Sequence, residues 1–570
     1  MKKFYQSLSL LLVLGTTIVN AQFTQIWSAD YQHTVSPGFS NEGKKMVKDS
    51  GGNIYLVADV TSDLDPTGVV TGSTYHYTVL KKYDASGVLQ ASRNILVHNH
   101  LASGFTLRGA FGLEIDALDQ IYVGYVSYNT ITNYNISVAK YDINLVRTWI
   151  SSFIPSGIEE GVDLKVSPNG TVYGLVKSTN GSDTQYHIIK PDSGLITAVP
   201  FFSFDLNVDF PSSMIVDGND DVFVTGYQMI ASIKSALTAG IKNSGTYKWK
   251  KTYNGGSVPR DDSGTKIVAG TGNELFIVGY SDRGIPNSYD AMVMKYYKTN
   301  GRLDWVLFLD DNFGFETGFF VNAYTNLSLY TASVSGNKVI LDRVDSRNGV
   351  HTGRHIYQPE PAAAFNSINS VSVTDMEVSP DKNVYLSGNI LASDLAGENF
   401  SAIYCAKFYP VTGRVPLANS FKMDFEIPAE GDFNNSYSSI ATLPSYSTNN
   451  FYVLADMFGP YDTHTNESVK LIGYDVSSPM RITADVESND FLNNTVNVLP
   501  NPATNFININ SNMSITKVEI KDMTGKTVIQ FDNFINSDKR IDISTLPSGM
   551  YLLTVYDDSS NPQISKFLKH

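Results

Sequence analysis

The chain has 570 residues, of which 42% are hydrophobic and 17% charged, with a formal net charge of −14. This composition supplies a large apolar core and excludes a disordered chain. No run of basic residues stands out among the 42 Lys and Arg, which argues against a nucleic-acid partner. A single cysteine, Cys405, excludes an intrachain disulfide and a zinc site built from cysteines.

The N-terminal segment has the three parts of a secretory signal. Lys2 and Lys3 form a positive region, Leu8 to Val19 is a short apolar run, and Val19-Asn20-Ala21 is a small-residue cleavage site. The sequence therefore predicts a signal peptide over residues 1–21. No other stretch approaches the roughly 20 apolar residues that a membrane-spanning helix needs.

A turn followed by an aromatic or apolar strand recurs eight times after this segment. When the copies are aligned, we call the fourth residue of the pattern its anchor. The anchors are Tyr55, Tyr122, Tyr173, Phe223, Phe276, Leu329, Tyr385 and Tyr452. A period of this size indicates stacked or radial β units. Each copy also has room for four strands, and glycines such as Gly87 and Gly194 supply the positive φ of tight hairpins. We therefore predict an all-β fold with an eight-bladed β-propeller over residues 22–476, with seven blades as the alternative.

The best-formed copy runs from Tyr253-Asn254-Gly255-Gly256 to Asp290-Ala291-Met292-Val293-Met294-Lys295-Tyr296. It resembles a bacterial β-propeller repeat of the SBBP type, which implies a fold and leaves the function open. One strand stands outside the repeat: Ile26 to Tyr31 resembles the fourth strand of a unit but precedes the first copy. We expect it to complete the last blade and so close the ring.

Residues 477–496 read as a polar linker, and residues 497–570 as a separate module of short strands. Such alternation of strands with Gly and Pro turns predicts a small β-sandwich. Its ordered motifs centre on Pro500, Asn501, Pro502, Gly525, Gly549 and Tyr551. The module resembles the type A C-terminal sorting domain of the type IX secretion system of Bacteroidota. The resemblance implies the secretion machinery as a partner, export to the cell surface or medium, removal of the domain, and attachment to surface lipopolysaccharide.

Where several first strands are expected to begin, an acidic residue stands one or two positions before a glycine. These acids are Glu42, Glu160, Asp262, Glu316 and Glu430. Because first strands line the channel of a propeller, these carboxylates would ring its mouth; the alternative is that the step belongs to the repeat and the acids are solvated. No catalytic motif, complete set of metal ligands or phosphate loop is present, so we predict no catalytic residue, metal or cofactor.

The connections expected on the opposite face from the tight turns vary greatly in length. They carry aromatic residues that we predict to be exposed for binding: Phe105, Phe365, Phe400 and Tyr461, together with Phe111 and Phe458. Long loops on a rigid ring are where binding residues concentrate, and aromatic rings stack on sugars or fill a partner's pocket.

Two classes of function follow from these features. The sequence favours a non-enzymatic, exported scaffold that binds a protein or glycan ligand. The alternative is a secreted propeller enzyme, glycan-active or resembling quinone-dependent dehydrogenases. The latter resemblance lies in the segment from Lys298 to Trp305, and the Trp recurs in only a few copies.

Overall fold

The computed structural model describes the larger part of the chain. The described residues are 24–31, 41–64, 70–100, 109–129, 133–154, 157–194, 196–197, 200–255, 260–283, 289–309, 317–325, 328–358, 365–378, 383–394, 399–410, 421–430, 436–445, 450–458, 466–475, 497–499, 503–510, 515–522, 526–531, 540–556 and 562–570. The predicted signal peptide and the predicted linker lie outside them. Throughout the described part the regular elements are β-strands, and two compact units separate at Met480 and Arg481.

The first unit is built of sheets whose neighbouring strands are antiparallel and follow one another in the chain. The first four sheets, each from its inner strand outward, are β2 (Asn41–Lys48), β3 (Ile54–Leu64), β4 (Val70–Tyr83) and β5 (Leu89–His100); β6 (Ala110–Ile115), β7 (Ile121–Asn129), β8 (Asn133–Tyr141) and β9 (Arg147–Phe153), joined by β13 (Ile196–Thr197); β10 (Ile158–Val166), β11 (Val172–Asn180), β12 (Asp183–Ile189) and β14 (Phe202–Ser203); and β15 (Asp209–Val216), β16 (Val222–Ile230), β17 (Ile233–Ile241) and β18 (Tyr247–Tyr253).

The remaining sheets of this unit follow the same plan. They are β19 (Asp262–Ala269), β20 (Glu274–Asp282), β21 (Tyr289–Tyr297) and β22 (Leu303–Leu309); β23 (Thr317–Thr325), β24 (Ser328–Ser335), β25 (Lys338–Val344) and β26 (His351–Tyr357); β27 (Phe365–Val378), β28 (Val384–Asp394), β29 (Asn399–Pro410) and β30 (Phe421–Glu430); and β31 (Ser436–Ser445), β32 (Asn450–Phe458), β33 (Asn466–Asp475) and β1 (Thr24–Tyr31). The described strands thus supply eight sheets.

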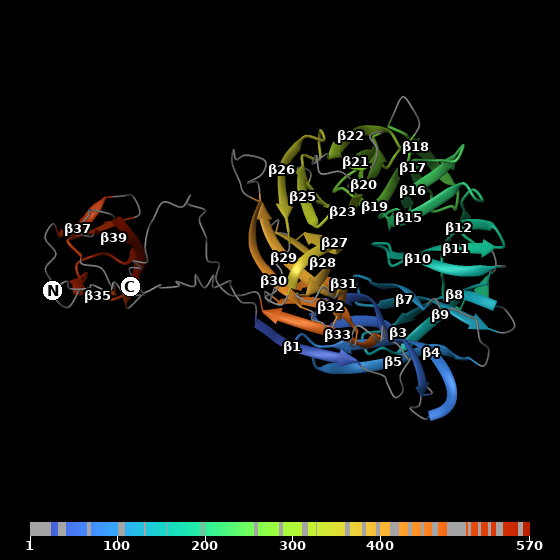
Figure 1. Ribbon diagram of the computed structural model, residues 1–570, viewed down its shortest axis with the longest axis horizontal. Coiled ribbons are helices and arrows are strands. Elements are labelled where there is room, and N and C mark those ends of the chain that lie inside the picture. The colour runs from blue at the N-terminus through green and yellow to red at the C-terminus, as the bar shows by residue number, and fades with distance from the viewer. Residues whose placement is uncertain are drawn as a thin grey trace, which may run out of the picture. The chain divides into compact units, whose positions relative to one another are not determined.

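The sheets are arranged radially around a ring (Figure 1). Each inner strand contacts the inner strand of the next sheet, in the order β2, β6, β10, β15, β19, β23, β27, β31 and back to β2. Radial sheets that meet along their first strands are the architecture of a β-propeller. The prediction of an all-β propeller is therefore confirmed.

The N-terminal strand closes this ring. Strand β1 pairs antiparallel with β33, from Thr24 opposite Asp475 to Tyr31 opposite Val469. The last sheet thus takes three strands from one end of the unit and its outer strand from the other end. The expectation that Ile26 to Tyr31 completes the last blade is confirmed, and the pairing removes an edge that β33 would otherwise expose.

Every inner strand carries a β-bulge, shown by a register shift between Gly43/Lys45, Ala110/Gly112, Gly161/Asp163, Pro211/Ser213, Gly264/Lys266, Gly318/Phe320, Val373/Asp375 and Ser439/Ala441. A bulge bends its strand and re-aims the side chains that follow it. Residues of the eight inner strands can therefore be compared by their position relative to the bulge.

Aromatic anchors of the second strands hold neighbouring sheets together. Tyr55, Tyr122 and Tyr173 are almost fully buried. The Tyr173 hydroxyl donates to the Asp220 carbonyl of the following sheet. The hydroxyls of Tyr55 and Tyr122 donate at 3.0 Å to Asp49 and Asp116 of their own sheets and lie 3.3 and 3.4 Å from the Ile143 and Gly170 carbonyls of the following sheets. The predicted anchor Leu329 is wrong by one position, because Tyr330 is the residue that pairs with β23 as Tyr55 pairs with β2.

Two tryptophans fasten the outer parts of neighbouring sheets. A Cβ on Gly301 would lie 2.5 Å from ring atoms of Trp249, and a Cβ on Gly349 would lie 2.7 Å from the ring of Trp305. Both glycines have positive φ, so each turn needs glycine for conformation and for space. The Trp249 indole also donates to the Lys298 carbonyl at 2.8 Å.

The second unit contains two further antiparallel sheets. One is β34 (Asn497–Leu499), β35 (Phe506–Asn510) and β38 (Arg540–Asp542); the other is β37 (Thr527–Phe531), β36 (Lys517–Asp522), β39 (Gly549–Tyr556) and β40 (Pro562–Lys569). Side chains of both sheets, among them Ile507 and Leu553, belong to one buried cluster. The unit therefore has a core of its own, as an independent domain requires.

Candidate functional site: the central channel

The inner strands place charged side chains at one repeated position, the residue directly after the bulge. In every second sheet this residue is charged, with alternating sign: Lys45 on β2, Asp163 on β10, Lys266 on β19 and Asp375 on β27. The four sheets between them carry Gly112, Ser213, Phe320 and Ala441 there. The repeat therefore sets four charges at quarter turns around the ring.

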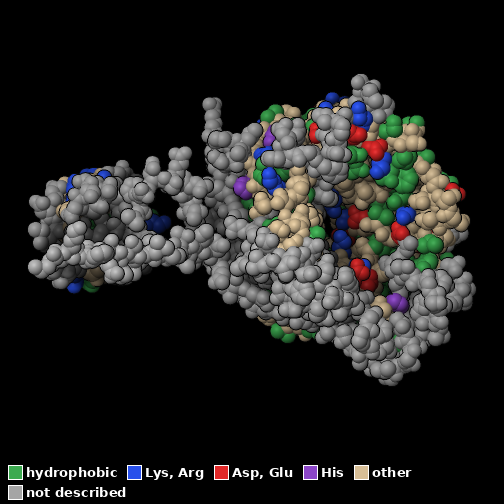
Figure 2. Space-filling model, viewed as in Figure 1, with side chains coloured by type: hydrophobic (Ala, Val, Ile, Leu, Met, Phe, Trp, Pro, Cys, Tyr) green, Lys and Arg blue, Asp and Glu red, His purple; other side chains and the backbone are tan. Residues whose placement is uncertain are grey.

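These four side chains converge on one space. The charge of Lys266 is close enough to those of Asp163, Asp375 and Lys45 to influence its pKa. Their strands, β2, β10, β19 and β27, are not neighbours in the ring, so their side chains can meet only across its middle. Figure 2 shows Lys or Arg and Asp or Glu side chains together inside the hollow of the propeller.

On one side of the channel a lysine lies between two acids. The ammonium of Lys165, two residues after Asp163 on β10, lies 2.5 Å from a Glu114 carboxylate oxygen and 3.3 Å from Asp163. Burial alone would lower the pKa of Lys165, but Asp163 and Glu114 together raise it above its ordinary value. This lysine therefore stays charged and satisfies two acids.

The opposite side of the channel has an acid where β10 has its lysine. Glu377 follows Asp375 by two residues on β27, so the two carboxylates share one face of the strand. Burial, together with Asp375 and against the opposing effect of Lys266, raises the pKa of Glu377 to about 7. Near neutral pH this side therefore holds two like groups, one of which is partly protonated.

Lys266 itself has a lowered pKa, chiefly because of burial. Asp163 and Asp375 raise this pKa, while Lys165 and Lys45 lower it. Within the described part of the chain, neither Lys266 nor Lys45 has an ion-pair partner within 4 Å. The channel therefore presents two ammonium groups that its own carboxylates do not neutralise by contact.

The acids predicted at the channel mouth do not form one set. Glu42 pairs with Lys44 at 2.5 Å, and Glu160 with Lys177 at 2.7 Å. Asp262 is 1% exposed and accepts a hydrogen bond from the Gly255 amide. Glu430 is the last residue of β30, an outer strand, and Glu316 lies outside the described residues.

The reason lies in the register of the bulges. Asp262 is three residues before its bulged residue, whereas Glu42 and Glu160 are two residues before theirs, so they point to the other face of the strand. The true equivalents of Asp262 are Glu159 and Asp209, which are also buried. Glu159 accepts from the Ser178 hydroxyl, and Asp209 pairs with Lys250 at 2.6 Å. These buried acids fasten strands within their sheets.

Acids on the tight-turn face are also occupied. The Asp116 carboxylate accepts from the amides of Leu118 and Gln120, and that of Asp217 from the amides two and four residues further on. Asp84 and Asp142 repeat this pattern. Since each carboxylate caps its own turn, the tight-turn face offers few free acceptors for a ligand.

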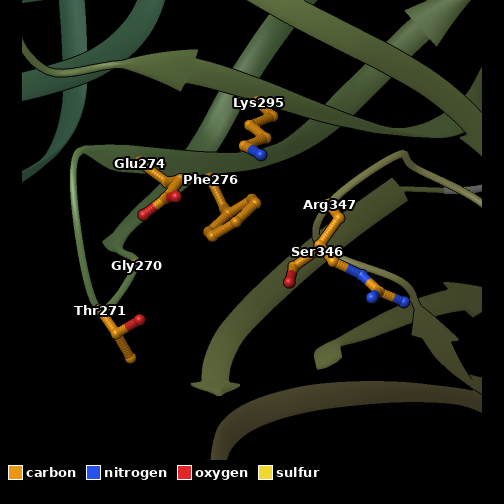
Figure 3. A pocket seen from close by; sticks show the side chains of 7 residues that line it. All are labelled: Gly270, Thr271, Glu274, Phe276, Lys295, Ser346 and Arg347. Carbon is orange, nitrogen blue, oxygen red and sulfur yellow. The ribbon is translucent and has the colours of Figure 1, made fainter. Parts of the chain in front are cut away.

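A small pocket with a cavity volume of about 30 Å³ lies on the tight-turn side between the fifth and sixth sheets (Figure 3). Its two cations already have partners. Lys295 lies 3.3 Å from Asp304, and Arg347, whose side chain extends away from the other lining residues, is bound to Asp345. The pocket therefore has less unsatisfied charge than the channel.

Of the aromatic residues predicted for binding, Phe105 and Tyr461 lie outside the described residues. Phe365 begins β27 and Phe400 lies on β29, so both are placed on strands. Phe458 ends β32. The prediction of an exposed loop position for Phe111 is wrong: it is the bulged residue of β6, it packs against the core of its sheet, and its ring fills the space where Gly161 lacks a Cβ.

The described motifs of the second unit have structural roles. The Tyr551 hydroxyl donates to the Pro547 carbonyl at 2.8 Å, and its ring stacks on Phe567. Gly549 begins β39, and Asp522 caps the turn before Lys526. Pro500, Asn501, Pro502 and Gly525 lie outside the described residues.

Within the described ranges, no group of three or more His, Cys, Asp or Glu side chains is placed to hold a metal ion. The same ranges contain no helix with the length and apolarity to cross a membrane.

Comparison with known families matches residues 497–570 to the secretion system C-terminal sorting domain. The second unit therefore carries a type IX sorting domain, as its motifs predicted, and the chain is exported to the cell surface or beyond. Comparison of the sequence with curated proteins gives no match.

Among solved structures, the chain is similar to the Dos1 propeller, with 9% identity and a TM-score of 0.37 over 66% of this chain and 94% of that one. It is also similar to the propeller domain of the Trilobed protease from Pyrococcus furiosus, with 11% identity and a TM-score of 0.32 over 65% and 95%. PorZ of Porphyromonas gingivalis, described as a surface component of the type IX secretion system, shows 11% identity and a TM-score of 0.21 over 93% and 86%. Scores in this range carry no inference about function.

Proposed function

We propose that the chain is an exported, non-enzymatic binding protein. Its sorting domain engages the type IX secretion machinery and is then removed, and the propeller remains as a secreted or surface-attached scaffold for a protein or glycan ligand. The observation that supports binding most directly is the convergence of charged side chains from four inner strands in the channel, where Lys45 and Lys266 lack contact partners in the described part of the chain. A small number of convergent polar groups in a concave site fixes the orientation of a ligand.

The enzyme alternative gains no support from the tryptophans that suggested it. Trp249 and Trp305 pack against glycines of the next sheet, where they fasten the ring. Their recurrence therefore has a structural explanation that needs no quinone.

Delivery is tested by fusing a signal peptide and residues 481–570 to a reporter in a cell that has the type IX system. We expect the reporter outside the cell with the C-terminal unit removed. A matched fusion with Tyr551→Ala, which loses the hydroxyl bond to Pro547 and the stacking on Phe567, should reach the outside less efficiently. Retention of the unaltered fusion in the periplasm would contradict this part of the proposal.

Binding is tested with the purified protein lacking the sorting domain on arrays of glycans and of extracellular proteins. We expect reproducible binding of at least one class, weakened by Lys266→Met and unchanged by Lys251→Met on the outer strand β18, where the lysine is exposed. Binding that both variants leave unchanged would place the site outside the channel.

A further inference from the structure

Two neighbouring sheets carry a tyrosine near the end of the second strand, away from the tight turn that precedes this strand. Tyr227 on β16 and Tyr280 on β20 occupy the same position, four residues after the anchors Phe223 and Phe276. In the other sheets of the ring this position carries Asp59, Val126, Lys177, Val334, Asn389 and Asp456. The repeat therefore does not require a tyrosine there, and its presence in the fourth and fifth sheets calls for another explanation.

The first of these rings is part of a stack within the protein. Tyr227 stacks on its cross-strand neighbour Phe210, with ring centroids 4.8 Å apart. Lys234, from the strand on the other side, places its ammonium 5.1 Å from the centre of the Tyr227 ring. An edge of the stack also meets Tyr186 of the preceding sheet, whose ring lies 6.0 Å from that of Phe210. Tyr227 is thus flanked from both neighbouring strands, which gives it a packing role.

The second ring lacks this cover. The cross-strand neighbours of Tyr280 are Ser263 on β19 and Ala291 on β21, both of them small residues. Tyr289 meets it edge to face, with centroids 5.4 Å apart and ring planes at 75°. Since such a contact occupies one face of one ring only, Tyr280 keeps a ring face without an aromatic neighbour in the described part of the chain, and its side chain is partly exposed.

Polar groups of both signs border this surface. Asp261 joins the two sheets: its carboxylate accepts from the Lys234 amide at 2.9 Å, and its backbone carbonyl accepts from the Asp282 amide at 2.9 Å. Asp282 follows Tyr280 by two residues, and its carboxylate lies 3.7 Å from the guanidinium of Arg260. The two cations and two acids balance, so the surface has no excess charge that would attract a strongly charged ligand.

We propose that this surface binds a neutral oligosaccharide, one sugar ring of which stacks on Tyr280 while its hydroxyls form hydrogen bonds with Asp261 and Lys234. The C–H face of a pyranose is apolar and matches an aromatic ring, whereas its hydroxyls both donate and accept, so one ligand satisfies a carboxylate and an ammonium together. An apolar peptide side chain would cover the ring but would desolvate the bordering charges without giving them hydrogen bonds. The site rests on the proposed role of the chain as an exported binding protein, but it does not use the channel lysines.

The test is isothermal titration calorimetry of the full chain, expressed without its signal peptide, at pH 7.5. The neutral probes are the hexasaccharides of cellulose, chitin, xylan and mannan. Two further probes are hexaproline, whose rings also stack on tyrosine, and a heparin hexasaccharide, which is strongly anionic. We expect saturable binding of at least one neutral hexasaccharide, tighter than that of hexaproline or heparin. No binding of any neutral sugar, or tighter binding of hexaproline or heparin than of all four, would overturn the proposal.

The decisive variant is Tyr280→Val, because valine stands at this position in the second and sixth sheets and is compatible with the repeat. We expect it to weaken sugar binding about fivefold or more, with a melting temperature close to that of the wild type. Tyr280→Phe keeps the ring and should keep the affinity. The matched control is Tyr227→Val, which removes a ring that is already flanked and should leave the sugar affinity unchanged.

The variants also separate this site from the channel. Lys266→Met should not change sugar binding. If Lys266→Met weakens it while Tyr280→Val does not, the sugar lies in the channel, which refutes this site and supports the proposed function. Equal losses in Tyr280→Val and Tyr227→Val would show that the effect belongs to packing between the sheets, and they would likewise overturn the proposal.

Discussion

The β10 and β27 sides of the channel are built from the same repeat but differ in how their charges are satisfied. On β10, Lys165 is held between Glu114 and Asp163, whereas on β27 the equivalent residue is Glu377, beside Asp375. The repeated frame thus carries a lysine at this position on β10 and a glutamate on β27. The comparison teaches that a propeller repeat fixes where side chains point, while the residue type at each copy decides whether a position holds the ring together or is left open to a ligand.

The largest effect is expected on the satisfied side. Lys165→Met leaves Glu114 and Asp163 without their shared cation, and breaking a buried ion pair costs about 3–5 kcal/mol. Because the Lys165 side chain is 29% exposed, we expect a smaller loss, about 2–3 kcal/mol, in the free energy of unfolding. Urea denaturation at pH 7.5 measures it, with Lys251→Met as the control. A loss no larger than that of the control would remove the distinction between the two sides.

The next effect is a pH dependence on the open side. Burial, reinforced by Asp375, raises the pKa of Glu377 to about 7 from a usual 4.5, so the folded state holds a proton that the unfolded state has lost. Glu377 therefore makes stability fall as pH rises between about 4.5 and 7. Glu377→Gln should remove this part of the slope and raise stability at pH 8 by up to about 3 kcal/mol. Melting temperatures at pH 5 and pH 8 test this. A wild-type slope retained in the variant would show that another group is responsible.

The smallest effect is expected from Lys266. Since this lysine makes no ion pair within 4 Å among the described residues, Lys266→Met should change the free energy of unfolding by less than about 1 kcal/mol. Chemical denaturation beside Lys165→Met gives the comparison. Equal losses for the two variants would mean that Lys266 also fastens the ring.

Much of the fold follows from the sequence. The repeated anchors predict the radial sheets, and the unpaired strand before the first copy predicts the pairing of β1 with β33. The anchor at Leu329 was misplaced because Leu327-Ser328-Leu329 matches the pattern as well as Tyr330 does. The structure resolves this ambiguity through the pairing of Tyr330 with Asn322.

The four charged residues of the channel could not be identified from the sequence, because the positions of the bulges were not known. Lys45, Asp163, Lys266 and Asp375 each lie ten residues before the aromatic anchor of their copy, a spacing that the sequence does contain. Alternation along an ordinary strand would assign them no particular face, because a bulge shifts the residues on one side of it relative to those on the other. The same shift explains why Glu42 and Asp262 were grouped although they face in opposite directions.

The measurement that tests the central claim most directly is the stability of Glu377→Lys in urea at pH 7.5. If β27 lacks the cation that β10 has, the new lysine pairs with Asp375, and the variant unfolds at a higher urea concentration than the wild type. A lower midpoint, with an unchanged dependence on denaturant, would show that the β27 side has no place for a cation and would contradict this account of the channel.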